Sequence, residues 1–157
     1  MRVPTAARAA LVPVAASALT LAGLSAWAGS GAAGSPSEPV VTRARVLLPA
    51  NPDTTAAFFD IRNRGGADDE LVEVSSPAAG RAMLSRVEVR DGAGTMRMVP
   101  SVRLPAGGTL RMSTAGVDVM VDDPPSVRVG DRMPFVLRFR DAGPVRVEAV
   151  VVRPGDL

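Results

Sequence analysis

The chain has 157 residues, of which 18 are Arg, none is Lys and 16 are Asp or Glu, so its formal net charge is only +2. The arginines are spread singly and aromatic residues make up 3% of the chain, which argues against the basic, aromatic-lined stripe of a nucleic-acid binder. The chain has no Cys and no His, which excludes disulfides, thiolate metal sites, a lipidated cysteine and the usual general base near neutral pH.

The N-terminal segment, residues 1–28, has the pattern of an export signal. Two arginines precede an uncharged run from Ala9 to Trp27, and Ala26-Trp27-Ala28 matches the small-x-small cleavage pattern. We therefore predict a signal peptide and a mature chain that begins near Gly29. The alternative is an uncleaved anchor helix, because the apolar run is nearly long enough to span a bilayer. Both forms predict an exported protein, and only the second attaches it to the membrane.

Residues 29–39 are small, polar and Pro-containing, which is typical of a flexible linker, so we expect one folded domain over residues 40–157. Within that domain the apolar residues recur at spacing two, in short bursts that end at Gly, Pro, Asp or Asn, as in antiparallel β structure. The expected strands are residues 40–48, 56–62, 70–75, 83–90, 95–99, 108–112, 117–121, 133–140 and 144–152. This pattern predicts a single-domain, all-β fold, a Greek-key β-sandwich or barrel.

Residues 91–94, Asp-Gly-Ala-Gly, are expected to form a hairpin turn between two of these strands. They are not expected to bind phosphate, because a strand and not a helix N-terminus follows them. Acidic residues gather at Asp68, Asp69 and Glu70, beside turn signals, which favours solvated loops over paired catalytic carboxylates. Ser85 has no His or Lys to activate it as a nucleophile, so we predict that the protein is not an enzyme.

Four segments of the expected domain carry a family resemblance, namely residues 67–81 (ADDELVEVSSPAAGR), 104–108 (LPAGG), 129–131 (VGD) and 134–139 (PFVLRF). They are similar to the corresponding segments of the periplasmic copper chaperones of the PCuAC family. The resemblance extends over roughly residues 40–152, which is nearly the whole domain. It implies a cupredoxin-like fold, Cu(I) as the bound metal and delivery of that copper to a cuproenzyme or its assembly factor, in the setting of cytochrome oxidase assembly.

The family's copper motif, H-x10-M-x21-H-x-M, fits this chain without a gap. Its two methionines fall on Met96 and Met120, and its two histidines fall on Ser85 and Asp118. The thioethers suit Cu(I), whereas the carboxylate is a hard donor and the hydroxyl is neutral, so the stronger half of the ligand set is missing. The resemblance thus implies a metal site at Met96 and Met120 with both histidine positions substituted.

Other methionines lie close to these positions. Met98 is two residues from Met96, and Met83 is two residues from Ser85, so each shares a strand face with its neighbour and is a further candidate ligand. The alternative for methionine is core filling, which we expect for Met83 and for two others, Met112 and Met133.

On the expected strand 117–121, the valines at positions 117, 119 and 121 lie on one face, and Asp118 and Met120 lie together on the other face. Asp118 on that face is expected to be a surface acid.

Two functions follow as hypotheses from different classes. The first is an exported copper-chaperone-like protein that holds Cu(I) weakly through methionine and passes it on. The second is a structural or protein-interaction β-sandwich whose copper site has decayed.

Overall fold

The computed structural model describes residues 5–29, 34–90 and 93–156 of the chain. It divides into two units, Met1–Ser35 and Pro36–Leu157. The described part of the first unit contains the helix α1 (Thr5–Gly29), which includes Pro13. No helix in the described part of the chain has the length and apolarity needed to cross a membrane.

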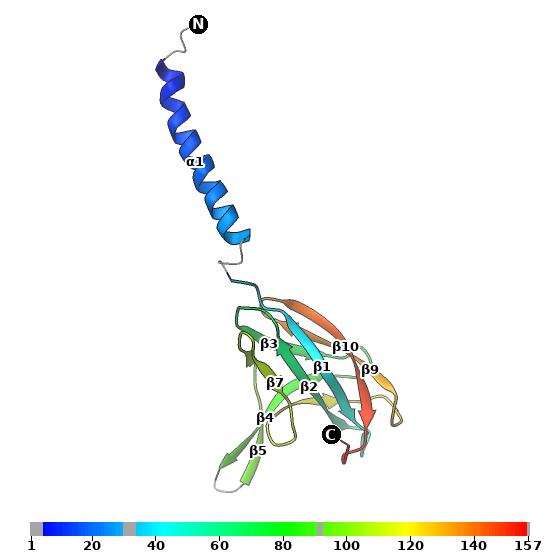
Figure 1. The fold of residues 1–157 in the computed structure, drawn as a ribbon. Helices are drawn as coiled ribbons and strands as arrows, with labels where there is room; N and C mark the ends of the chain where they lie inside the picture. The colour runs from blue at the N-terminus through cyan, green and yellow to red at the C-terminus, as the bar shows by residue number, and fades with distance from the viewer. Residues whose placement is uncertain (1–4, 30–33, 91–92, 157) are drawn as a thin grey trace. The chain divides into compact units, whose positions relative to one another are not determined.

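The second unit is built from ten strands (Figure 1). They are β1 (Pro39–Leu47), β2 (Thr54–Asn63), β3 (Asp69–Ser75), β4 (Ala82–Arg90), β5 (Ala93–Met98), β6 (Val102–Leu104), β7 (Thr109–Arg111), β8 (Val117–Asp122), β9 (Arg132–Phe139) and β10 (Gly143–Val152). Each of the nine strands expected from the sequence is present, with ends that agree within two residues. The additional strand, β6, has three residues, which is too short to show a period of two.

The strands form one hydrogen-bonded sheet in the order β5-β4-β8-β2-β1-β10-β9-β3-β6, with β7 also paired to β2. Every pair in the described residues is antiparallel except β1 with β10, which is parallel. Sequence neighbours such as β2 and β3 are not partners, so the chain repeatedly crosses between distant positions in the sheet. The all-β, sandwich-type prediction is confirmed.

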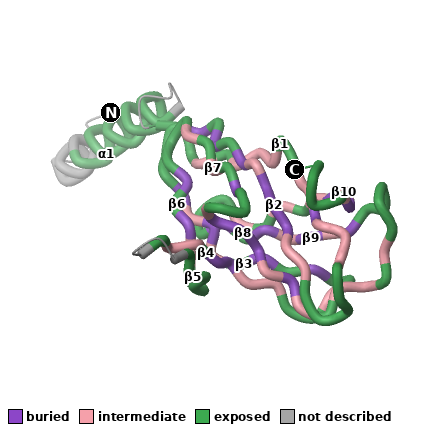
Figure 2. The backbone as a smooth tube through the Cα atoms, turned by 90° about the horizontal axis from the view of Figure 1, so that it is seen from below, coloured by how far each residue is buried: buried purple, intermediate pink, exposed green. Residues whose placement is uncertain are grey.

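The sheet curves so that its two halves face each other across one core. Phe59 of β2 meets Phe135 of β9 edge to face, with ring centroids 5.3 Å apart and planes at 73°. Their strands are three steps apart in the sheet, so this contact crosses the interior. Figure 2 shows the buried backbone positions along the central strands. Aromatic packing at this spacing adds about 0.5–1.5 kcal/mol to the stabilisation from burial.

Hydrogen bonds of buried polar groups hold the N-terminal end of the domain in place. The Asn63 side chain is fully buried; its Oδ1 accepts from the amides of Glu38 and Gly65, and its Nδ2 donates to the Ala67 carbonyl. A Cβ at Gly65 would lie 1.9 Å from the Pro36 carbonyl oxygen, so only glycine allows this approach. Pro36 and Glu38 therefore already contact the folded domain, although composition assigns both to the linker.

Asp69, at the start of β3, is a structural carboxylate. It is 4% exposed, so the expectation of a solvated loop acid is wrong at this position. The reason is a set of donors from distant segments, namely the Ser37 hydroxyl and the amides of Glu70, Asp141 and Ala142. Burial raises the pKa of Asp69, but these hydrogen bonds together outweigh burial and hold the pKa below its ordinary value of 3.8.

Candidate functional site

The candidate site begins with the pairing of β4, β5 and β8. Ser85 of β4 lies directly opposite Asp118 of β8, and Met83 lies opposite Met120. On its other edge β4 pairs with β5, where Met96 lies opposite Val87. Directly opposed residues have side chains on the same face of a sheet. The outer face of these three strands therefore carries the residues of the sequence motif.

Met96, Asp118 and Met120 line one cavity of about 280 Å³, which we call the thioether cavity. Its other walls come from both ends of the domain: Leu47, Leu48, Ala50, Thr54, Thr55, Ala56 and Pro154. Sequence spacing could not identify these walls, because the β1–β2 loop and the C-terminal segment reach the site only through tertiary folding. The cavity places both motif thioethers beside a carboxylate.

Ser85 and Asp118 form a buried pair inside this face. Ser85 is 0% exposed and Asp118 3%, so the expectation that Asp118 is a surface acid is wrong. The Ser85 hydroxyl donates a hydrogen bond to Asp118 Oδ1, and this bond satisfies an acid that would be costly to bury alone. Residues of the β1–β2 loop and the C-terminal segment, including Leu48 and Pro154, line the same cavity and cover this face, and the alternation of a single strand does not reveal such a cover.

The two remaining candidate methionines lie at a different cavity. Met83 and Met98 line a depression of about 240 Å³ together with Val72 and Val74 of β3. Met98 is 50% exposed and Met83 is half-buried, so the expectation of core filling is wrong for Met83. The same expectation is confirmed for Met112 and Met133, which are buried in the core. Met96 and Met120 thus share one cavity and Met98 and Met83 share the other, while Met83 is also the cross-strand neighbour of Met120.

Met96 combines proximity to the thioether cavity with access to solvent. It is 47% exposed, on the hairpin formed by β4 and β5. Of residues 91–94, which were expected to form a turn, Ala93 and Gly94 belong instead to β5 and pair with Arg90 and Val89, and Asp91 and Gly92 lie outside the described residues. A half-exposed methionine at the rim can contact a bound ion and an approaching protein, whereas Met120, further inside, cannot reach both so readily.

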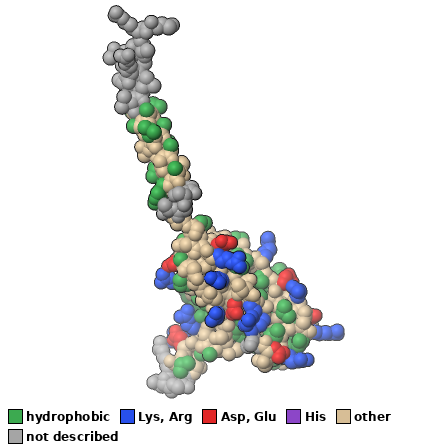
Figure 3. Space-filling view, in the orientation of Figure 1, with side chains coloured by type: hydrophobic (Ala, Val, Ile, Leu, Met, Phe, Trp, Pro, Cys, Tyr) green, Lys and Arg blue, Asp and Glu red, His purple; other side chains and the backbone are tan. Residues whose placement is uncertain are grey.

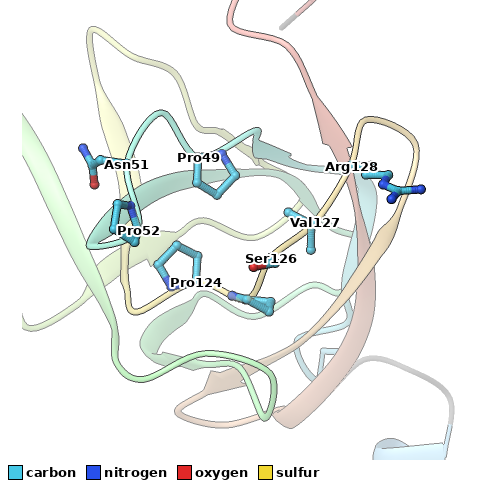
Figure 4. Close-up of a pocket in the computed structure, with 8 residues that line it drawn as sticks. Pro49, Asn51, Pro52, Pro124, Ser126, Val127 and Arg128 are labelled. Atoms are coloured by element: carbon cyan, nitrogen blue, oxygen red, sulfur yellow. The ribbon is translucent and has the colours of Figure 1, made fainter.

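A second cavity, of about 420 Å³, lies beside the thioether cavity (Figure 4). Its walls come from the β1–β2 and β8–β9 loops, and four of its residues are prolines: Pro49, Pro52, Pro124 and Pro125. The β1–β2 loop lines both cavities, with Pro49 on one and Leu48 and Ala50 on the other. Proline restricts the backbone of these loops, which keeps the walls of both cavities in place.

The donor set of the thioether cavity favours a soft ion. Two neutral thioethers suit Cu(I), and one carboxylate adds charge without imidazole basicity. Among the described residues no three His, Cys, Asp or Glu side chains come together as a metal site.

Comparison with known sequences gives two related results. The sequence profile of the family described as "Putative lipoprotein LpqE-like" matches residues 39–151. A protein of Leifsonia xyli subsp. xyli described as "Putative lipoprotein Lxx21020" is 34% identical over 89 residues, which are 55% of this chain. The alignment spans only 54% of that relative's own length.

Comparison with solved structures returns PCuAC domains. The Cu(I) form of DR1885 from Deinococcus radiodurans, solved in solution, is 28% identical with a TM-score of 0.57, over 76% of this chain and 79% of that chain. The apo PCuAC domain from PmoF1 is 22% identical with a TM-score of 0.63, over 76% and 97% of the two chains. At that identity the second likeness concerns the fold alone. The resemblance predicted from the sequence is confirmed.

Proposed function

Because the chain belongs to the LpqE-like family, whose profile matches residues 39–151 and so nearly all of the β-sheet domain, we propose that it is an exported copper-binding protein of the chaperone type. The proposed cargo is Cu(I), held by the thioethers of Met96 and Met120 and passed to a cuproenzyme or its assembly factor. The observation that carries this proposal is the thioether cavity, where both motif methionines and Asp118 line one space. The family and the fold are those of copper chaperone domains, which are not enzymes.

The chemistry of the cavity explains why such a site would suit transfer. Neutral thioethers bind Cu(I) without a proton to lose, so uptake and release do not depend on ligand deprotonation. Replacing both imidazoles by a hydroxyl and a carboxylate weakens the site. A weak site with the half-exposed Met96 at its rim releases its ion to a partner whose ligands are stronger.

The test is a Cu(I) competition titration of the purified chain against a chromogenic chelator of moderate affinity. The wild-type chain is expected to take up one Cu(I), and the double variant Met96→Leu with Met120→Leu is expected to lose at least about tenfold in affinity. Met133→Leu is the matched control, because it also removes a thioether but lies in the core. Equal uptake by all three proteins, or none by the wild type, would contradict the proposal.

A second candidate function is a protein-interaction module that no longer binds copper. The observation in its favour is the Ser85–Asp118 hydrogen bond, which satisfies one carboxylate oxygen inside the protein instead of on a metal. This alternative predicts the same melting temperature with and without Cu(I), because a ligand stabilises only the state that it binds. A copper-dependent rise of several degrees would reject it.

Export is proposed on residues 1–28 and on the lipoprotein description of the family. A lipid on cysteine is excluded within the printed sequence, which has no Cys. The N-terminal segment is therefore the proposed export signal, either cleaved near Gly29 or retained as an anchor, with residues 29–39 as the linker. N-terminal sequencing of the protein from the exported fraction distinguishes the two, because only cleavage yields a start near Gly29.

A further inference from the structure

The outer face of β1, β2 and β7 carries a cluster of arginines that the copper proposal does not use. Figure 3 shows Arg side chains gathered on this face of the domain. Arg43, Arg45 and Arg111, with Asp60, line a cavity of about 320 Å³, which we call the arginine cleft. Its other lining residues are Phe58, Met112, Ser113 and Thr114. None of these residues lines the thioether cavity.

Strand pairing explains how arginines that are distant in sequence meet here. Asp60 of β2 lies opposite Arg43 of β1 on one edge and opposite Arg111 of β7 on the other. Arg45, two residues along β1, shares the face of Arg43 and lies opposite Phe58. Three arginines and one aspartate therefore line the same cavity, and the Arg43 guanidinium is within ion-pair distance of the Asp60 carboxylate.

The charges in the arginine cleft do not balance. The contact between Arg43 and Asp60 is long, at 3.8 Å, and Arg43 remains largely exposed. Three guanidinium groups and one carboxylate leave an excess of two positive charges within one small cavity. The positively charged arginine side chains repel each other, and the single carboxylate of Asp60 offsets only part of this repulsion. A bound anion would offset the remainder.

Arg45 gives the second, independent observation. Its Nε is buried, and it has no hydrogen-bond partner among the described residues; no other buried side-chain nitrogen or oxygen there is in this condition. A buried donor without a partner is costly in a folded protein, by roughly 1–3 kcal/mol in general. The same side chain also lines the cleft, so a rotation of its guanidinium group toward a bound anion would give this donor a partner.

We propose that the arginine cleft binds a phosphate group. A guanidinium presents a planar fork of donors that matches two phosphate oxygens, and the double negative charge of phosphate equals the excess in the cleft. The hydroxyls of Ser113 and Thr114, both exposed at the rim, supply further donors. Phe58 and Met112 give the cleft an apolar floor, which suits an ester of phosphate as well as the free ion.

The test uses inorganic phosphate as its probe, titrated into the full chain and followed by amide chemical shifts. The variant Arg45→Gln with Arg111→Gln is expected to weaken phosphate binding at least about tenfold. The matched control is Arg86→Gln with Arg97→Gln, a cross-strand pair on the β4–β5 hairpin that removes the same charge elsewhere. The control is expected to bind phosphate within about twofold of the wild type.

Equal weakening in both double variants, or no phosphate binding by the wild type, would overturn the proposal. Arg43→Gln with Arg111→Gln is the second variant, because it keeps the buried Arg45 and so protects the fold; it is expected to weaken binding to a similar degree.

A vesicle-binding experiment distinguishes between a lipid headgroup and a soluble phosphate as the ligand of the cleft. Phosphatidylglycerol vesicles are compared with phosphatidylcholine vesicles, with the same three double variants and the wild type. Loss of phosphatidylglycerol binding beyond that of the control assigns the cleft to a lipid headgroup. Loss of phosphate binding with unchanged vesicle binding assigns it to a soluble phosphate. The comparison between variants cancels any contribution of α1, which all of them share.

Discussion

The thioether cavity and the arginine cleft lie on neighbouring parts of one sheet, yet they are built for opposite chemistry. β8, which carries Asp118 and Met120, pairs with β2, which carries Phe58 and Asp60 of the cleft. The first site offers two neutral thioethers beside one acid, and the second offers three guanidinium groups and one acid. Ala56 lines the first cavity and Phe58 and Asp60 line the second, so one face of β2 separates two sets of side chains of different chemistry along its length.

The largest expected effect comes from restoring imidazole to the thioether cavity. Ser85→His with Asp118→His places two strong ligands beside Met96 and Met120, so Cu(I) affinity should rise by roughly 100-fold or more. A competition titration measures the change. Phosphate binding should stay the same, because neither residue lines the arginine cleft. No gain in Cu(I) affinity would mean that the four positions do not share one site.

The two sites also differ in how much of each could be predicted from the sequence. Met96 lies on β5, and Asp118 and Met120 lie on β8, and both strands pair with β4. A motif with fixed spacing between these residues can therefore be recognised in the sequence. Arg43 and Arg111 come from strands on opposite edges of β2, and as single arginines they carry no spacing signal. A motif search therefore finds the first site, and the second becomes visible only in the folded sheet.

Some features of the fold could likewise be predicted from the sequence, and others could not. Alternation of apolar residues located the long strands, because one face of each contacts the core. It could not locate β6, which is too short, or the parallel pairing of β1 with β10, which depends on long-range topology. Burial of Asp69 and Asp118 was missed for a related reason, since both carboxylates are satisfied by donors from segments distant in sequence.

The next largest effect is on stability and lies outside both sites. Asp69→Ala removes the acceptor for Ser37 and for three amides, so it should lower the free energy of unfolding by about 2–4 kcal/mol. Denaturant unfolding measures this. In conditions where the variant is still folded, Cu(I) and phosphate affinities should both match the wild type. A selective loss of one affinity would show that this site depends on the β3 end of the domain.

The same carboxylate predicts a pH dependence. The folded state holds the pKa of Asp69 below its ordinary value of 3.8, so the unfolded state binds the proton more tightly. The stabilisation is complete above pH 3.8 and is lost as pH falls through the folded-state pKa. Acid unfolding curves should therefore be shallower below this pH for Asp69→Asn than for the wild type. Parallel curves would contradict the assigned role.

The smallest expected effect concerns salt. Raising sodium chloride from 0.05 to 0.5 M should weaken phosphate binding at the arginine cleft several-fold, because guanidinium–phosphate attraction is screened. Cu(I) affinity measured at constant pH, with a perchlorate salt that does not bind copper, should change by less than about twofold, because the thioethers are neutral and the buried Asp118 is only weakly screened by salt. A similar salt dependence at both sites would remove the chemical distinction between them.

The most direct test of the central claim is NMR of the chain labelled with ¹³C at the methionine methyl groups. The chain has seven methionines, so the ligands and the controls are observed in one spectrum. On addition of one equivalent of Cu(I), the account predicts that the Met96 and Met120 methyl signals shift together while those of Met112 and Met133 do not. Shifts confined to Met83 and Met98, or no shift at any methionine, would contradict it.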